Sequence, residues 1–145
     1  MTQNNDLQLA SNLRTVVARL TKKLRKTSVT GQMLSLTERS TISALYQHKQ
    51  LLPSELASME KITNQSMSQV LNHLLELGFI TRTASETDKR KVIISLTEEG
   101  ERILLQVRSE RDEWLANAIK ENFNDDEEAL LRKLIAPLTR LVDFE

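Results

Sequence analysis

The sequence lacks cysteine altogether and has only three glycines, two prolines and five aromatic residues in 145 positions. Without cysteine it can form no disulfide, no thiolate zinc site and no thiol redox sensor. So few glycines and prolines disfavour a many-stranded β protein, and none is placed for a phosphate-binding loop. No apolar run approaches the roughly 18 residues of a membrane span, and the first residues do not resemble a secretion signal. We therefore expect a mainly helical, soluble, cytoplasmic protein with no membrane partner.

Catalytic and metal-binding patterns are missing as well. The sequence has neither a His-Glu-x-x-His motif nor a Gly-x-Ser-x-Gly nucleophile turn. Its two histidines, His48 and His73, lie 25 positions apart, which disfavours a metal site. Many carboxylates fall in the first turns of predicted helices, where the helix dipole explains them. We expect no enzyme, no cofactor and no bound metal.

The chain has no net charge, because 20 basic residues balance 20 acidic ones. Residues 1–50 nevertheless carry eight basic and two acidic side chains (net +6), and residues 96–145 carry seven and thirteen (net −6). The segment between them, residues 51–95, has five of each. Such asymmetry is compatible with a polyanion along part of the surface and also with ordinary solvated helix faces.

Apolar periodicity predicts long helices at both ends of the chain. Residues 5–27 carry an apolar stripe at steps of three and four, and the breakers that follow end this helix. Thr97 is expected to cap a second long helix. Asn124 and Glu127 resemble a capping box at the start of a third, which Pro137 is expected to kink.

Three short helices are predicted between these ends. Thr37 is expected to cap the first, which ends before Gln50. Pro53 suits the first position of the second, because its missing N–H would be unpaired there anyway. Thr63 is expected to cap the third, and Gly78 to end it in a left-handed conformation.

The pattern changes to β after the third short helix. Residues 79–83 and 92–96 are β-prone runs joined by a polar, charged loop, which is typical of a hairpin. A two-stranded ribbon is not stable alone, so we expect it to lean on the helices. The predicted fold class is mainly α with a small β-hairpin wing: a winged helix-turn-helix at residues 35–100 plus terminal helices.

Three segments carry a family resemblance: LTERSTISAL, LLPSELASMEKITNQSMSQVLNHLLELGFITR and DKRKVIISLTEEG. They resemble the core of the multiple antibiotic resistance regulator (MarR) family of bacterial transcription factors. The strongest match is Asp88 and Arg90 followed by the strand and Gly100. Glu60 and Lys61 depart from the family pattern, because an apolar residue and often glycine is expected at this turn. The resemblance implies one domain over residues 1–145, with a DNA-reading core at 35–100.

Short polar side chains at the start of the third short helix suit a helix that reads the major groove of DNA. Asn and Gln can pair with adenine, and Ser can reach bases or phosphates. The alternative is an exposed polar helix start, but the basic hairpin that follows favours DNA. His73, farther along this helix, is either a phosphate contact or simply exposed. The predicted reading residues are Thr63, Asn64, Gln65, Ser66, Ser68 and Gln69.

The hairpin is expected to supply the second DNA contact. Arg90 suits the negative potential of a narrow minor groove, and Asp88 can hold its guanidinium in position. Lys89 and Lys91 would neutralise phosphates. Two further phosphate contacts are predicted, Arg82 on the first strand and Ser54 at a helix N-terminus.

The terminal helices, residues 5–27 and 97–142, carry more apolar surface than one small domain covers, so we expect a homodimer. The residues expected in this interface include Leu9, Leu13, Trp114, Leu131, Leu134 and Leu138. The resemblance implies a repressor that binds pseudo-palindromic duplex DNA and is released by a small-molecule effector; no effector-binding residue is assigned. The alternative is a winged-helix protein interaction module without DNA binding, which the balanced charge of residues 51–95 leaves open.

Overall fold

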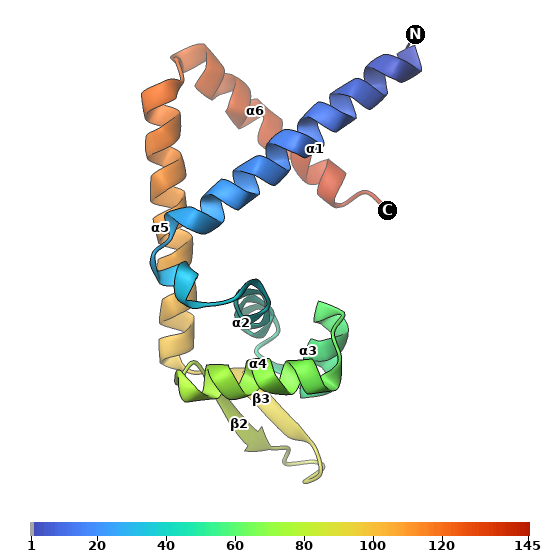
Figure 1. Cartoon of the computed structure of the whole chain (residues 1–145), viewed down its shortest axis with the longest axis vertical. Helices are drawn as coiled ribbons and strands as arrows, with labels where there is room; N and C mark the ends of the chain where they lie inside the picture. The colour runs from blue at the N-terminus through green and yellow to red at the C-terminus, as the bar shows by residue number, and fades with distance from the viewer. Residues whose placement is uncertain (1) are drawn as a thin grey trace.

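The computed structural model describes residues 2–145, over which it has six α-helices, one 3-10 helix and a three-stranded antiparallel sheet. The elements are α1 (Thr2–Thr27), η1 (Thr30–Met33), α2 (Leu36–His48), β1 (Gln50–Leu51), α3 (Pro53–Glu60), α4 (Asn64–Glu76), β2 (Ile80–Ala84), β3 (Val92–Leu96), α5 (Glu98–Asn122) and α6 (Asp125–Val142). Figure 1 shows α5 running from the sheet, α2, α3 and α4 at one end of the molecule to α1 and α6 at the other. The predicted fold class, mainly α with a small hairpin wing, is confirmed.

Most helix ends lie where the sequence predicts them. Thr63, Thr97 and Asn124 each cap a helix by accepting a hydrogen bond from a backbone N–H three residues later. Gly78 follows α4 with a φ of 78°, a conformation that glycine adopts without steric cost. Its N–H donates to the Leu75 carbonyl and the Phe79 N–H to the Leu74 carbonyl, so the last turn of α4 is satisfied.

The predicted cap at Thr37 is wrong, because α2 begins two residues earlier, after Ser35. The Glu38 N–H donates to Ser35 Oγ (3.1 Å), and the Ser35 N–H donates to Glu38 Oε1 (2.8 Å). This capping box satisfies two helix-end donors at once, which a cap at Thr37 would leave unpaired.

The prediction of a two-stranded ribbon also misses a third strand. β1 pairs with β3 through Gln50↔Ser95 and Leu51↔Ile94, which gives a sheet in the order β1-β3-β2. β2 begins at Ile80 instead of residue 79, because the Phe79 N–H is already committed to the end of α4. The 3-10 helix η1 was not predicted.

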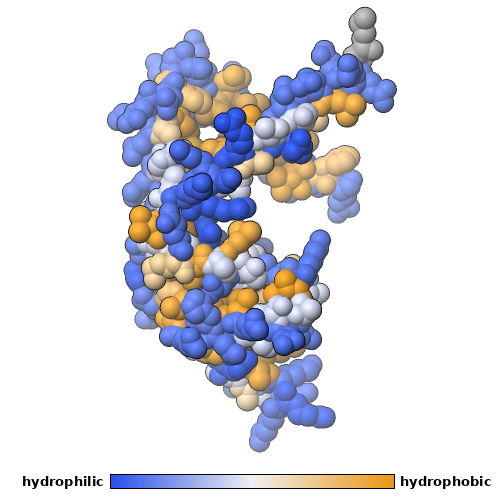
Figure 2. Space-filling view, in the orientation of Figure 1, coloured by the Kyte–Doolittle hydropathy of each residue, from blue (hydrophilic) through white to orange (hydrophobic). Residues whose placement is uncertain are grey.

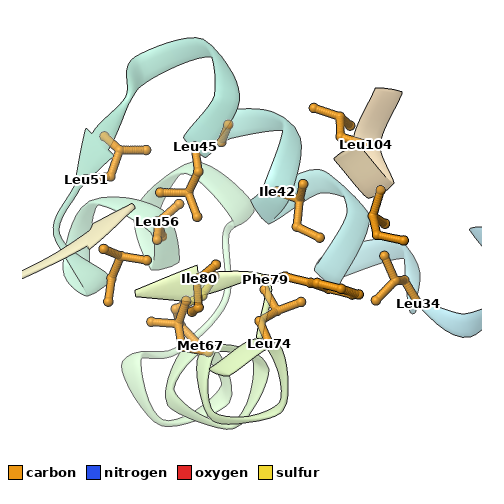
Figure 3. Close-up of a cluster of buried hydrophobic side chains, with 14 of the residues drawn as sticks. Leu34, Ile42, Leu45, Leu51, Leu56, Met67, Leu74, Phe79, Ile80 and Leu104 are labelled. Atoms are coloured by element: carbon orange, nitrogen blue, oxygen red, sulfur yellow. The ribbon is translucent and has the colours of Figure 1, made fainter. Parts of the chain in front are cut away.

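The hydrophobic core gathers side chains from α2, α3, α4, the sheet and the start of α5 (Figure 3). Leu56 on α3, Met67, Leu71 and Leu74 on α4 and Ile94 on β3 are all fully buried. Large-to-small substitution at such positions typically costs about 2–5 kcal/mol, so this cluster fixes α3 and α4 against the sheet.

The terminal helices are joined to this core mainly through α5. Glu110 on α5 accepts hydrogen bonds from Thr30 (2.8 Å) and Ser28 (2.9 Å), which lower the pKa of its carboxyl. Neither α1 nor α6 has a buried residue, and Figure 2 shows hydrophobic side chains at the surface of this end of the molecule. Among residues 2–145, no helix is sufficiently long and apolar to traverse a lipid bilayer.

Candidate nucleic-acid interface

Helix α4 has one buried face and one polar, exposed face. Met67, Leu71 and Leu74 recur at steps of four and three and pack into the core. The predicted reading residues on the first two turns are exposed, namely Asn64, Gln65, Ser66, Ser68 and Gln69. The core therefore fixes the orientation in which α4 presents its polar side chains to solvent.

Thr63 and Ser66 have a structural task at the start of α4. The Ser66 N–H donates to Thr63 Oγ1 (3.0 Å), and that hydroxyl donates to Ser66 Oγ (2.9 Å). Thr63 thus caps the helix, and its hydroxyl is already engaged. Within residues 2–145, the side chains of Asn64, Gln65 and Gln69 make no hydrogen bond, so their donors and acceptors remain open to a ligand.

The turn between α3 and α4 forms despite its departure from the family pattern. Lys61 has a φ of 56°, in the left-handed region that favours glycine. The Ile62 N–H donates to the Ala57 carbonyl (3.0 Å), so the helix end is satisfied at the expense of backbone strain. Glu60 accepts a hydrogen bond from Ser40 Oγ on α2 (2.6 Å), which gives this acidic residue a positioning role at the turn.

The loop of the wing is held by Ser85, which sequence reasoning missed. Ser85 is buried, and its Oγ accepts hydrogen bonds from the N–H groups of Thr87 and Asp88 (both 3.3 Å). Its own N–H donates to the Lys91 carbonyl (2.9 Å), and the Lys91 N–H donates to the Asp88 carbonyl (2.9 Å). The Ser-x-x-Asp spacing of residues 85–88 is the signal that could have predicted this turn.

Asp88 and Arg90 lie together at the tip of the wing. The Arg90 N–H donates to Asp88 Oδ1 (3.1 Å), and Arg90 Nε lies 3.7 Å from the same oxygen. Asp88 therefore shapes the turn first and holds the guanidinium only loosely. The Arg90 side chain is 95% exposed, and Lys89 and Lys91 are exposed beside it.

The last two predicted residues, Arg82 and Ser54, are exposed on β2 and in the first turn of α3. All twelve predicted residues belong to the end of the molecule formed by α3, α4 and the hairpin (Figure 1). Thr63 through Gln69 form one group at the start of α4. Residues 88–91 form a second group at the hairpin tip, which projects away from α4 in Figure 1.

His73 is exposed, and its Nδ1 is bonded to Glu38 on α2, so only its Nε2 is open to a phosphate. Burial works to raise the pKa of Glu38, but the hydrogen bonds from the Ser35 N–H, His73 and the Ser35 hydroxyl outweigh it, so this pKa is lowered. The pair ties the exposed helix α4 to the start of α2.

Three of the five carboxylates in residues 51–95 are occupied within the domain. Glu55 accepts from the Leu52 N–H (3.0 Å), Glu60 from Ser40, and Asp88 from the Arg90 N–H. A balanced charge count in this segment therefore does not mean that acidic side chains cover the predicted interface.

Comparison with known proteins gives a consistent result. Residues 34–92 match the model of the MarR family. An HTH-type transcriptional regulator of Mycobacterium bovis, Mb0904, is 31% identical over 140 residues, which is 97% of this chain and 96% of the relative. The crystal structure of a transcriptional regulator from Pseudomonas aeruginosa has a TM-score of 0.86 and 34% identity, covering 98% of this chain and 99% of that one. A mutant of S. aureus MepR, bound to an oligodeoxyribonucleotide, has the same fold at 20% identity and a TM-score of 0.71, covering 93% of this chain and 96% of that one.

Proposed function

This chain belongs to the MarR family of transcriptional regulators, and we propose from that premise that it binds double-stranded DNA as a homodimer and represses the adjacent genes. The observation that carries the proposal is the pairing of an exposed polar helix start with an exposed arginine at the tip of an ordered hairpin. A helix of this kind fits the major groove, and an arginine on a hairpin fits the minor groove beside it.

Each protomer reads one half-site in this proposal. Asn64, Gln65 and Gln69 contact base edges, and their amides favour adenine. Arg90 enters the minor groove, whereas Lys89 and Lys91 neutralise phosphates. The remaining predicted contacts fix the register of the protein on the duplex: Ser54, Ser66, Ser68 and Arg82. Thr63 contributes through its cap of α4, because its hydroxyl is already engaged there. Asp88 acts indirectly, because it shapes the turn that carries Arg90.

The exposed apolar surface of the terminal helices supports a homodimer. Leu9 on α1 is 69% exposed, and Leu134 on α6 is 40% exposed. Apolar side chains that stay exposed along α1 and α6 are costly to leave in water. Residues 5–27 and 97–142 are therefore the proposed dimerisation helices. A two-fold axis between the protomers would set the two α4 helices about one turn of DNA apart and would require a pseudo-palindromic site.

Repression follows from occupancy, since a dimer that covers a promoter excludes the polymerase without any further contact. A small-molecule effector would relieve it by stabilising a dimer whose two α4 helices no longer match the half-site spacing. Such a regulator acts where the bacterial chromosome is, in the cytoplasm.

Duplex binding measured against salt concentration tests the proposal. For a regulator that neutralises several phosphates, the logarithm of the binding constant should fall linearly with the logarithm of the salt concentration. The slope should be about −0.9 per phosphate contact. A winged-helix module that binds only proteins would show little retention of any duplex, even at low salt. That result would refute DNA binding and favour the interaction module.

A further inference from the structure

Two residues other than glycine have a positive φ among residues 2–145, and both are lysines: Lys49 at 70° and Lys61 at 56°. A lysine rarely adopts this left-handed region, because its Cβ crowds the neighbouring backbone, whereas glycine adopts it freely. Each lysine ends a helix, Lys49 after α2 and Lys61 after α3. Residues held in such strained conformations cluster at functional sites, so the side chains of both lysines are of interest.

The side chain of Lys49 has a partner inside the chain. Its Nζ lies 5.0 Å from the centroid of the Tyr46 ring, which is a cation–π contact with the preceding turn of α2. Its backbone N–H donates to the Leu45 carbonyl (2.9 Å) and so ends the helix. Both the backbone and the side chain of Lys49 are therefore used within the domain.

The side chain of Lys61 has no such partner. It is exposed, and none of the ion pairs or cation–π contacts found over residues 2–145 includes it. Its backbone N–H donates to the Ser58 carbonyl (3.2 Å), a bond that glycine would make equally well and without strain. What lysine adds to this turn, compared with glycine, is thus its charged side chain.

The carboxylates of α3 do not pair with this charge. Glu60, which precedes Lys61 in the sequence, accepts a hydrogen bond from Ser40 Oγ on α2 (2.6 Å). Glu55, in the first turn of α3, accepts from the Leu52 N–H (3.0 Å). The ammonium of Lys61 therefore stays open to an external anion, at a position two residues before the cap of α4.

We propose that Lys61 binds a phosphate of the DNA backbone beside the start of α4, and that the backbone strain at this turn is retained for the sake of that charge. The open amides of Asn64 and Gln65 follow three and four residues later, so a duplex that reaches them brings its backbone close to the turn. A lysine ammonium is a compact charge on a flexible stem, which suits a phosphate. The contact rests on the proposed function, because it requires duplex DNA at α4.

Stability and DNA affinity should consequently change in opposite directions at this residue. Glycine in place of Lys61 relieves the strain, which stabilises the fold, and removes the charge, which weakens DNA binding. A lysine with a structural role alone would affect stability and leave the affinity unchanged. Such opposed effects are typical of residues whose strain serves a function.

Thermal unfolding and duplex binding of three full-length variants test the proposal. Lys61→Gly should unfold at a Tm roughly 1–4 °C above that of the wild type. Its Kd for duplex should rise at least roughly tenfold at about 0.1 M salt, and the slope of log Kd against log salt should fall by about two, because a homodimer loses one phosphate contact at each half-site. Lys61→Asn should lose as much affinity, since asparagine tolerates a positive φ and carries no charge. Lys61→Arg should keep the salt slope, since it keeps the charge.

Lys49→Gly is the matched control, because it removes the same charge from the other exposed lysine with a positive φ. It should keep both the duplex affinity and the salt slope. Equal losses in Lys49→Gly and Lys61→Gly would overturn the proposal, because they would reflect net charge alone. A loss in Lys61→Arg as large as that in Lys61→Gly would also overturn it, because the conformation of the turn would then carry the effect.

Failure of the phosphate contact and failure of the proposed function give different results. If the wild type binds duplex with a steep salt dependence and Lys61→Gly binds equally well, the contact is refuted and DNA binding stands. If the wild type retains no duplex even at low salt, both are refuted.

Discussion

The substitution Arg90→Ala removes the proposed minor-groove contact with little effect on the fold. The Arg90 side chain is 95% exposed, and its Nε lies 3.7 Å from the nearest Asp88 oxygen. The hydrogen bond that shapes the turn comes from the Arg90 backbone N–H, which alanine keeps. Exposed substitutions of this kind change the free energy of unfolding by less than about 0.5 kcal/mol. The Tm of the variant should therefore match that of the wild type.

The effect on DNA binding should be much larger. Loss of one arginine contact in a groove costs about 1–3 kcal/mol, and a homodimer loses it at both half-sites. We expect the Kd for duplex to rise at least roughly 30-fold, which corresponds to about 2 kcal/mol. The slope of log Kd against log salt should fall by about two, because two cations no longer displace counterions.

Fluorescence anisotropy of a labelled duplex, repeated at several salt concentrations, measures both quantities. Arg102→Ala is the matched control, since it removes the same charge from an exposed position of α5 that is not among the predicted DNA contacts. The reasoning is refuted if Arg90→Ala binds DNA as the wild type does, or if the control loses as much affinity.

Three further predictions concern stability and assembly. Glu38 has a lowered pKa in the folded state, so it stabilises the protein above the ordinary carboxyl value of 4.5 and this contribution disappears as the pH falls through the lower folded value. Glu38→Gln should thus be less stable than wild type at pH 7, and chemical denaturation should show the difference shrinking below pH 4.5; a constant difference would contradict the assigned pKa shift. Lys61→Gly should raise the free energy of unfolding by roughly 0.5–1 kcal/mol, because glycine adopts its φ of 56° without strain, and a lower unfolding midpoint would contradict this. Leu134→Glu should give monomers in sedimentation equilibrium, whereas Met59→Glu, at an exposed site on α3, should leave the dimer intact; dimers from both variants would remove α6 from the interface.

Much of the fold could be predicted from local signals. The caps at Thr63, Thr97 and Asn124 are each set by a side chain three residues from its partner, so the sequence alone reveals them. The cap of α2 was misplaced because Ser35 and Thr37 are both good caps, and only the partner Glu38 distinguishes them. β1 has two residues and depends on pairing with β3 more than forty positions later, which no local pattern shows.

The sequence likewise predicts some features of the candidate interface and misses others. Its exposed side chains could be predicted, because apolar spacing fixes which face of α4 is buried. The link from Ser40 to Glu60 and the pairing of His73 with Glu38 could not, since both join helices that meet only in the folded chain.

Selection of bound duplexes from a random-sequence pool by the purified protein tests the central claim most directly. The account predicts enrichment of an inverted repeat whose half-sites lie about one helical turn apart, with adenine at the positions that Asn64, Gln65 and Gln69 reach. Enrichment of a single unpaired half-site would contradict the two-fold arrangement. No enrichment at all would contradict DNA reading by this protein.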